Sequence, residues 1–408
     1  MTERSSTVTS DLRRVVLSHY CRLAMVVALL CNFTVSCAPE GPTGSQTAST
    51  PNDTLEVVLA HPSPCLTNEL SSLSPIGETE LSSDRGWPSP RSIAWSPSTD
   101  TMVVLNQRRR AVALVSIADG ELLRHEFGSF GRRPPTLIGT ARDSLMVWNE
   151  NDHDITILNP DFVRQGSIAV TGLPEGARKL VIARYPDGDY LVRMTTEMPP
   201  DMAGYHGRVR DLFLRHNPST GGFDTLIALN GQRLADLQGI IVPAPLSFEP
   251  TAVVWANDLF VLEPSEGVLH KVTSRGHFVY RLVVNDMGDL SAGAKRSVLS
   301  LVFGQQAMRD SALAAEALRL PFPERVPTFE FLVGDSGGRL WLRRVRSPDT
   351  LSEWIVLDVR GDFTSPCRVV GPLGLEVVDA ADSTFVGLWS DGVMRSALKR
   401  YRIAWREK

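Results

Sequence analysis

The stretch FEFLVGDSGGRLWLRR, at residues 329–344, decides the predicted fold because it holds two short apolar runs with a turn between them. Aromatic and branched runs of this length, bounded by Asp and Gly, are typical of β-strands, whereas a helix would place its apolar residues three or four positions apart. The same unit recurs along the chain from residue 55 onward. The sequence therefore predicts an all-β fold.

The repeated units begin at regular intervals. Their first strands start near Pro90, Pro135, Lys179, Thr251, Phe329 and Leu373. Three of the five intervals are 44 or 45 residues long, and two are longer. A four-stranded blade of a β-propeller spans about 40 to 50 residues, and longer intervals indicate insertions. We therefore predict a six-bladed β-propeller over residues 55–408.

The last unit supplies only three strands before the chain ends at Lys408. We expect the apolar strand of residues 55–60 to complete this blade, since propellers commonly close by joining their two chain ends. Cys65 and Cys367 would then be neighbours. A disulfide between them is one expectation, and two separate buried thiols are the other.

Two insertions interrupt the repeat. Residues 195–209 are rich in Pro and Met and are expected to form a long loop. Within residues 290–320, apolar residues recur at helical spacing before two prolines, which predicts one or two helices packed on the propeller. Such helices could cover a blade edge as a strut, or act as a lid or docking element for a partner.

Residues 1–36 have the pattern of an export signal. Four Arg residues accompany an apolar run over residues 23–30, which is shorter than the about 20 residues that a spanning helix needs. The segment Thr34-Val35-Ser36-Cys37 resembles the lipobox of bacterial lipoproteins, although Thr34 stands where that pattern prefers leucine. The resemblance implies that Cys37 receives a lipid. The alternative is ordinary secretory cleavage nearby.

Residues 37–54 are rich in Pro, Gly, Ser and Thr and are predicted to be a flexible tether. Loss of residues 1–36 removes four Arg and two acidic residues, so the formal net charge changes from −4 to −6. A mildly acidic domain is a poor candidate for binding nucleic acid or an anionic lipid surface. We expect the protein to be exported and to be anchored in the cell envelope by its N-terminal lipid, in the periplasm or at the outer membrane.

Several motifs resemble known propellers. The stretch EFGSFGR, at residues 126–132, resembles the linker between blades of NHL-type six-bladed propellers. Residues 338–344, 354–358 and 386–389 resemble the last two blades of the exported six-bladed propeller lipoproteins of environmental bacteria. The resemblance covers most of residues 87–405 and implies the fold, but it assigns no functional residue.

Three motifs suggest chemistry but fit turns or strands better. GDSGG at residues 334–338 matches the nucleophile motif of trypsin-like proteases, yet no accompanying histidine segment is recognisable. The acidic stretch of residues 149–154 could bind Ca²⁺, but it lacks the twelve-residue loop with a closing glutamate. Arg343, Arg344 and Arg346 could bind an anion if they converged, although alternation along a strand argues against it.

These observations favour a binding function over catalysis. No catalytic triad, phosphate loop or metal set is indicated, and the eight His residues are scattered. We predict a tethered binding or scaffold module that holds a protein, peptide or glycan on one face of the propeller and needs no cofactor. The alternative is a metal-dependent hydrolase or lactonase similar to gluconolactonase-type six-bladed propellers, which would hold a divalent cation such as Ca²⁺ in the central channel.

Overall fold

The structure is a computed structural model of the 408-residue chain. It describes residues 54–59, 62–80, 92–96, 101–106, 111–116, 122–127, 136–141, 144–149, 153–159, 163–172, 178–195, 206–237, 240–284, 295–296, 298–299, 311–323, 326–345, 351–361, 363, 365–380, 383–390 and 396–406. The predicted signal, Cys37 and the predicted tether up to residue 53 lie outside these residues. Within them, no helix is long and apolar enough to cross a membrane.

The described residues form six sheets of four or five strands. The first two sheets contain β4 (Ser92–Ser96), β5 (Thr101–Asn106), β6 (Ala111–Ser116) and β7 (Leu122–Phe127), then β8 (Thr136–Ala141), β9 (Ser144–Asn149), β10 (Asp154–Leu158) and β11 (Arg164–Ala169). The third contains β12 (Arg178–Arg184), β13 (Tyr190–Thr195), β14 (His206–His216), β15 (Phe223–Leu237) and β16 (Ile240–Pro243). The fourth contains β17 (Thr251–Trp255), β18 (Asp258–Glu263), β19 (Val268–Thr273) and β20 (Gly276–Val283). The last two contain β21 (Phe329–Gly334), β22 (Arg339–Arg344), β23 (Ser352–Asp358) and β24 (Cys367–Gly371), then β25 (Leu375–Ala380), β26 (Thr384–Ser390) and β27 (Ser396–Arg402).

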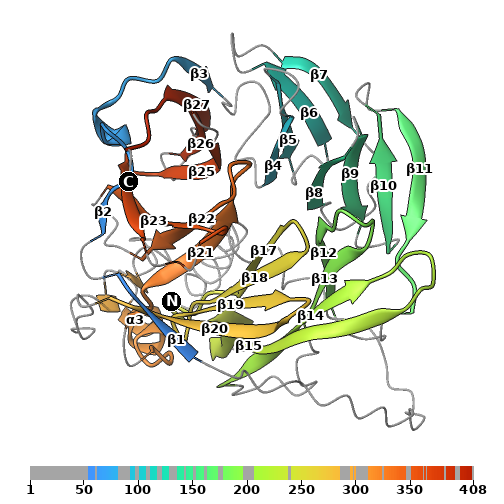
Figure 1. Cartoon of the computed structure of the whole chain (residues 1–408). Helices are drawn as coiled ribbons and strands as arrows, with labels where there is room; N and C mark the ends of the chain where they lie inside the picture. The colour runs from blue at the N-terminus through green and yellow to red at the C-terminus, as the bar shows by residue number, and fades with distance from the viewer. Residues whose placement is uncertain are drawn as a thin grey trace, which may run out of the picture.

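The six sheets surround a common axis, with the first strand of each sheet innermost (Figure 1). These first strands, β4, β8, β12, β17, β21 and β25, contact one another in ring order. Each of them begins within a few residues of a predicted start. The arrangement is a β-propeller, and the predicted fold class is confirmed.

The N-terminal segment runs along the outside of three successive sheets, and we call residues 54–80 the strap. Its strand β1 (Thr54–Val58) pairs in parallel with β20, and β2 (Ser63–Pro64) pairs in parallel with β24. Its last strand, β3 (Gly77–Glu80), pairs antiparallel with β27 and completes the last sheet. Figure 1 shows these three strands, in blue, at the periphery of the ring.

The prediction that residues 55–60 close the last blade was therefore wrong. The ring is closed by its N-terminal segment, but the closing strand is β3, which reads GETE. A strand at an outer edge pairs through its backbone and needs no apolar run, so β3 carries no strand signal in the sequence. The apolar residues of the predicted strand have another use, because Val57 and Leu59 are buried against the sheet of β17–β20.

A disulfide fastens the middle of the strap. Cys65 and Cys367 are bonded, with their Cα atoms 5.0 Å apart. Backbone hydrogen bonds extend the attachment, since the Cys65 N–H donates to the Arg368 carbonyl and the Arg406 N–H donates to the Cys65 carbonyl. The strap thereby joins the fifth sheet to the C-terminal residues of the chain.

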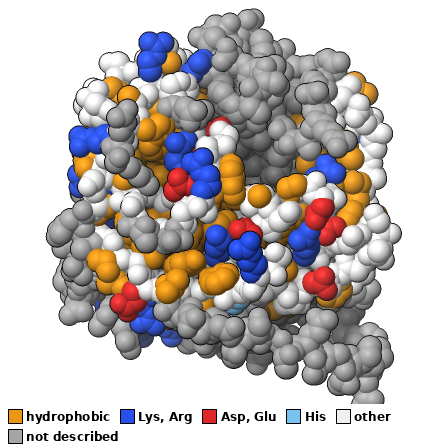
Figure 2. Space-filling model, viewed as in Figure 1, with side chains coloured by type: hydrophobic (Ala, Val, Ile, Leu, Met, Phe, Trp, Pro, Cys, Tyr) orange, Lys and Arg blue, Asp and Glu red, His pale blue; other side chains and the backbone are white. Residues whose placement is uncertain are grey.

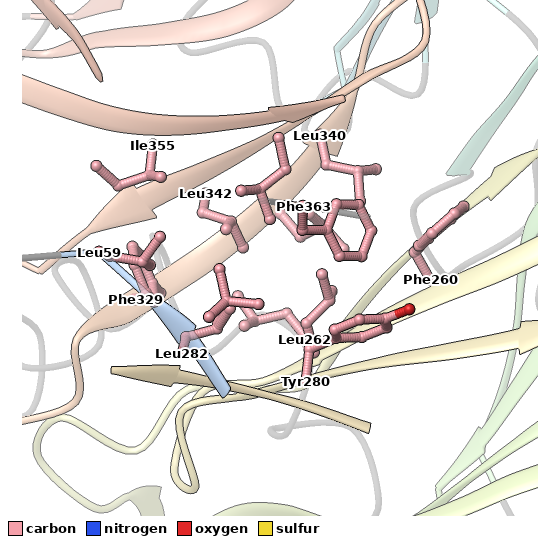
Figure 3. Packing of buried hydrophobic residues seen from close by; sticks show 14 of the residues in the cluster. Leu59, Phe260, Leu262, Tyr280, Leu282, Phe329, Leu340, Leu342, Ile355 and Phe363 are labelled. Carbon is pink, nitrogen blue, oxygen red and sulfur yellow. The ribbon is translucent and has the colours of Figure 1, made fainter. Parts of the chain in front are cut away.

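The core lies between neighbouring sheets rather than in one central mass. Figure 3 shows one such layer, in which Phe260 and Leu262 of β18 face Leu340 and Leu342 of β22, with Leu59 of the strap at its edge. Similar layers lie between the second and third, third and fourth, and fifth and sixth sheets. Central strands are apolar on both faces because each sheet is covered on both sides.

The two insertions lie where the sequence indicated them. A helix, α3 (Ser311–Ala317), is present between β20 and β21, within the range predicted to be helical. The strand β14 begins at His206, so the predicted loop of residues 195–209 is shorter than expected. β14 and β15 are longer than the other strands, and β15 carries the extra strand β16 on its second half.

Candidate functional site

One end of the ring collects the starts of the first strands. Neighbouring strands within a sheet are antiparallel, so the second strand finishes where the first begins. The third strand starts at this end and the fourth strand finishes there, as β24 does four residues before β25 begins. We call this end the first-strand rim. The opposite end carries the turns between first and second strands and between third and fourth strands.

An ion cluster lies at the first-strand rim between the fifth and sixth sheets. Arg343 on β22 pairs with Glu330 on β21 (Nε to Oε1, 2.7 Å) and with Glu376 on β25 (NH1 to Oε1, 2.9 Å). Burial raises the pKa of Glu330, and Glu376 raises it further, against the lowering effect of Arg343. Two carboxylates share one guanidinium, so this cluster favours an approaching cation.

Three large apolar side chains of the same two sheets are exposed at this end of the ring. Phe331 is 47% exposed and lies opposite Arg343 in the pairing of β21 with β22. Leu351, 44% exposed, directly precedes β23, and Leu373, 52% exposed, lies two residues before β25. Exposed apolar side chains rimmed by charges are typical of recognition surfaces. We call Glu330, Phe331, Arg343, Leu351, Leu373 and Glu376 the rim patch.

A second charged group near the rim is satisfied inside the protein. Arg193 on β13 donates two hydrogen bonds to Asp211 on β14 (both 2.9 Å) and one to Glu249 (2.7 Å). The Thr195 hydroxyl also donates to Asp211 (2.6 Å). Gly231 on β15 leaves room for this carboxylate, because a Cβ there would lie 2.4 Å from Oδ2.

This group is structural, with Arg193 and Asp211 buried and Glu249 partly exposed. Asp211 has no exposed surface, and Arg193 is held on two sides. Burial alone would raise the pKa of Glu249, but Arg193 lowers it to a net decrease. The group ties the third sheet to the linker that leads into β17.

The surface also carries charge. Figure 2 shows Lys or Arg and Asp or Glu side chains together near the middle of the described surface.

The GDSGG motif forms the turn between β21 and β22, at the end opposite the rim. Asp335 accepts hydrogen bonds from Arg339 Nε (2.7 Å) and Trp341 Nε1 (2.8 Å), which hold the turn in place. Ser336 donates from Oγ to Asp379 Oδ2 (3.1 Å), its one hydroxyl partner within the described part of the chain. The serine thus lacks a histidine base among the described residues, and the motif acts as a strand-connecting turn.

The other candidate motifs also resolve into strands and turns. Residues 149–154 connect β9 to β10, and residues 150–152 of that acidic stretch lie outside the described residues. Arg343 and Arg344 do not converge, because Arg344 pairs with Glu353 (NH1 to Oε1, 3.1 Å) instead of the rim patch carboxylates. Arg346 lies outside the described residues.

The rim patch was not predicted from the sequence. Glu330 and Arg343 approach each other only because β21 carries a bulge between Phe329 and Phe331 when it pairs with β22. Glu376 joins them from another sheet. The one sequence signal for this site is the position of Glu330 and Glu376 at the starts of two predicted first strands.

Among the described residues, no group of three or more His, Cys, Asp or Glu side chains could hold a metal ion. No known family model matches the sequence. No curated protein matches it either.

Solved structures of propeller-like proteins are similar to this chain at low identity. A member of the DUF4221 family from Bacteroides vulgatus is 10% identical, with a TM-score of 0.46, over 83% of this chain and 100% of that chain. A gluconolactonase from Xanthomonas campestris is 13% identical, with a TM-score of 0.40, over 84% and 98%. Regucalcin from Agrobacterium tumefaciens, a calcium-binding protein, is 11% identical, with a TM-score of 0.38, over 86% and 98%.

Proposed function

We propose that this chain is a tethered binding module of the cell envelope, which holds a protein or peptide segment on the rim patch. The observation that carries the proposal is the patch itself, where Phe331 and Leu373 are about half exposed at the same end of the ring as a cluster with one more negative than positive charge. Such a surface suits a segment that presents an apolar side chain next to Lys or Arg. A glycan is the less favoured ligand, because the patch offers only one exposed aromatic ring.

The way the strap enters the fold supports display of the rim patch. β1 runs parallel to β20, and Thr54 lies beside Val279 while Val58 lies beside Val283. Since β20 finishes at the first-strand rim, the chain enters β1 from the opposite direction. A lipid on Cys37 and a tether of residues 37–54 would therefore attach on the far side from the patch.

The disulfide supports an exported location. Structural disulfides persist in oxidising compartments such as the bacterial periplasm and cell surface. We infer that residues 1–36 are removed and that Cys37 is acylated. Labelling with a radioactive fatty acid tests this inference, with Cys37→Ser as the control. If the Cys37→Ser chain is labelled, or the unaltered chain is not, the inference is reduced to simple secretion.

The metal-dependent hydrolase alternative gains no support from the described residues. A lactonase of that type needs several oxygen ligands converging on one cation. Among the described residues no such group of three side chains occurs. The carboxylates at the rim, Glu330 and Glu376, are bound to Arg343 instead.

Site-specific cross-linking in intact cells tests the binding proposal. A photo-reactive amino acid at Phe331 or Leu373 should give a defined adduct with an envelope protein. The matched control is Val163, which is 57% exposed but lies in the turn between β10 and β11, at the end opposite the rim. Glu376→Lys should abolish the adduct by reversing the charge of the patch. Equal adducts from Val163, or no adduct from either rim position, would contradict the proposal.

A further inference from the structure

Two histidine rings contact each other on the sheet of β17–β20. His270 on β19 pairs with Val279, and His277 on β20 pairs with Val272, so the two side chains are diagonal neighbours on one face. Nδ1 of His270 lies 3.1 Å from Nε2 of His277. The ring centroids are 5.2 Å apart. The rings therefore meet nitrogen to nitrogen rather than by stacking.

A buried carboxylate holds the other nitrogen of His270. Oε2 of Glu263, on β18, lies 3.3 Å from Nε2 of His270, and the two residues are only 6% and 8% exposed. A carboxylate accepts hydrogen bonds, so the Nε2 proton of His270 faces Glu263, and in the neutral ring the lone pair of Nδ1 then faces His277. This carboxylate–histidine pair is the arrangement that orients imidazole ligands in metal sites.

We propose that His270 and His277 together bind one divalent transition-metal ion, of the Zn²⁺, Ni²⁺ or Cu²⁺ class, through Nδ1 and Nε2. A zinc–nitrogen bond is about 2.0 to 2.1 Å long, so two nitrogens on one ion lie about 2.9 to 3.4 Å apart in octahedral or tetrahedral geometry. The observed 3.1 Å falls in this range. On binding, His277 carries its proton on Nδ1, which leaves the Nε2 lone pair for the metal.

The surroundings favour this class of ion. Metal binding requires an imidazole nitrogen with a free lone pair, which a neutral histidine ring supplies. Imidazole nitrogens suit Zn²⁺, Ni²⁺ and Cu²⁺, whereas Ca²⁺ and Mg²⁺ prefer oxygen. His277 is partly exposed, which gives the ion access. The described residues supply no third donor, so the remaining positions are open to water or an exchangeable ligand.

Zinc titration of the purified, chelator-treated chain by calorimetry tests the proposal. We expect one saturable site. His277→Gln should weaken it at least 100-fold, because one of its two protein ligands is gone. Glu263→Gln keeps both ligands and should weaken it about 10- to 100-fold, as expected for an outer-shell partner. His153→Gln, which removes a histidine from the turn between β9 and β10 of another sheet, should leave the affinity unchanged.

A second test uses the unaltered chain, so it does not depend on whether a variant folds. It records the electron paramagnetic resonance spectrum of the chain with one equivalent of Cu²⁺. Two imidazole nitrogens bound to the ion should produce splitting from two nitrogens. Splitting from one nitrogen or none would overturn the proposal. So would the absence of saturable zinc binding, or a folded His277→Gln chain that binds zinc as tightly as the unaltered one.

Discussion

Tyr185 is a buried residue whose hydroxyl lacks a hydrogen-bond partner among the described residues. The Arg215 guanidinium carbon lies 4.4 Å from the centre of its ring, and Asp187 and Asp189 hold that guanidinium. Burial raises the pKa of Tyr185 to about 12, although Arg215 lowers it and the two Asp residues raise it. The neutral phenol is thus strongly favoured in the folded chain.

Tyr185→Phe should therefore leave stability unchanged at pH 7, or increase it by up to about 1 kcal/mol, because it removes an unsatisfied hydroxyl. The raised pKa contributes stability that is present below pH about 10 and lost as pH rises toward 12, since the unfolded phenol ionises first. This loss should be shallower in the variant. Urea denaturation at pH 7, 10 and 11 measures both effects. Tyr190→Phe, whose hydroxyl contacts Met146 Sδ (4.0 Å), is the control at pH 7 only, because burial also raises the pKa of Tyr190. A loss above about 1 kcal/mol at pH 7 would show that the hydroxyl is bonded.

Contacts between residues on different strands could not be predicted from the sequence. Arg193 and Asp211 are separated by 18 positions and come together only through the register of β13 with β14. The sequence shows an Arg in one apolar run and an Asp at the start of another, and gives no sign that both are buried. Gly231, which makes room for the Asp211 carboxylate, looks like an ordinary turn glycine in the sequence.

At the scale of elements, the strap binds by burying a few side chains along the outside of the ring. Leu59 is 2% exposed and lies in the layer between the fourth and fifth sheets, and its N–H donates to the Val283 carbonyl (2.7 Å). Val58, its neighbour, is 59% exposed. Substituting each residue in turn therefore distinguishes the contribution of a buried side chain from that of backbone pairing alone.

Leu59→Ala should reduce the free energy of unfolding by about 2 to 4 kcal/mol, because it leaves a cavity in a packed layer. Val58→Ala should change it by no more than about 0.5 kcal/mol. Chemical denaturation followed by tryptophan fluorescence compares the two variants with the unaltered chain. Equal, small effects would contradict the packing of the strap.

Elements with their own apolar runs were predictable, and elements that rely on neighbours were not. The first strands β17 and β21 begin at Thr251 and Phe329, where the sequence placed them. β3 and β15 were missed, since GETE has no strand signal and apolar and polar residues are mixed along β15. Pairing with an existing sheet edge overrides weak local preference in both cases.

At the scale of the whole molecule, the disulfide closes a loop that contains almost the entire ring. Cys65 and Cys367 are separated by 302 positions. Cross-links over long loops restrict the unfolded chain most, with typical contributions of about 2 to 4 kcal/mol. The bond also holds the strap covalently to the fifth sheet.

Reduction with dithiothreitol should therefore lower the free energy of unfolding of the unaltered chain by about 2 to 4 kcal/mol. The Cys65→Ala/Cys367→Ala double variant should have the reduced value and should not respond to the reductant. Denaturation of both chains, each with and without dithiothreitol, gives the comparison. A double variant as stable as the oxidised chain would show that the cross-link contributes nothing.

The direction of β1 has a mechanical consequence. A force on the chain ahead of Thr54 acts along the length of β1. The hydrogen bonds to β20 are therefore loaded in shear, all at once, instead of breaking one after another from one end. If β1 does slide free, extension stops a few residues later at Cys65, which the disulfide anchors to the start of β24. Force arriving from the N-terminal side would thus end at a covalent stop at the edge of the fifth sheet, before it reaches β3 and the seam that closes the ring.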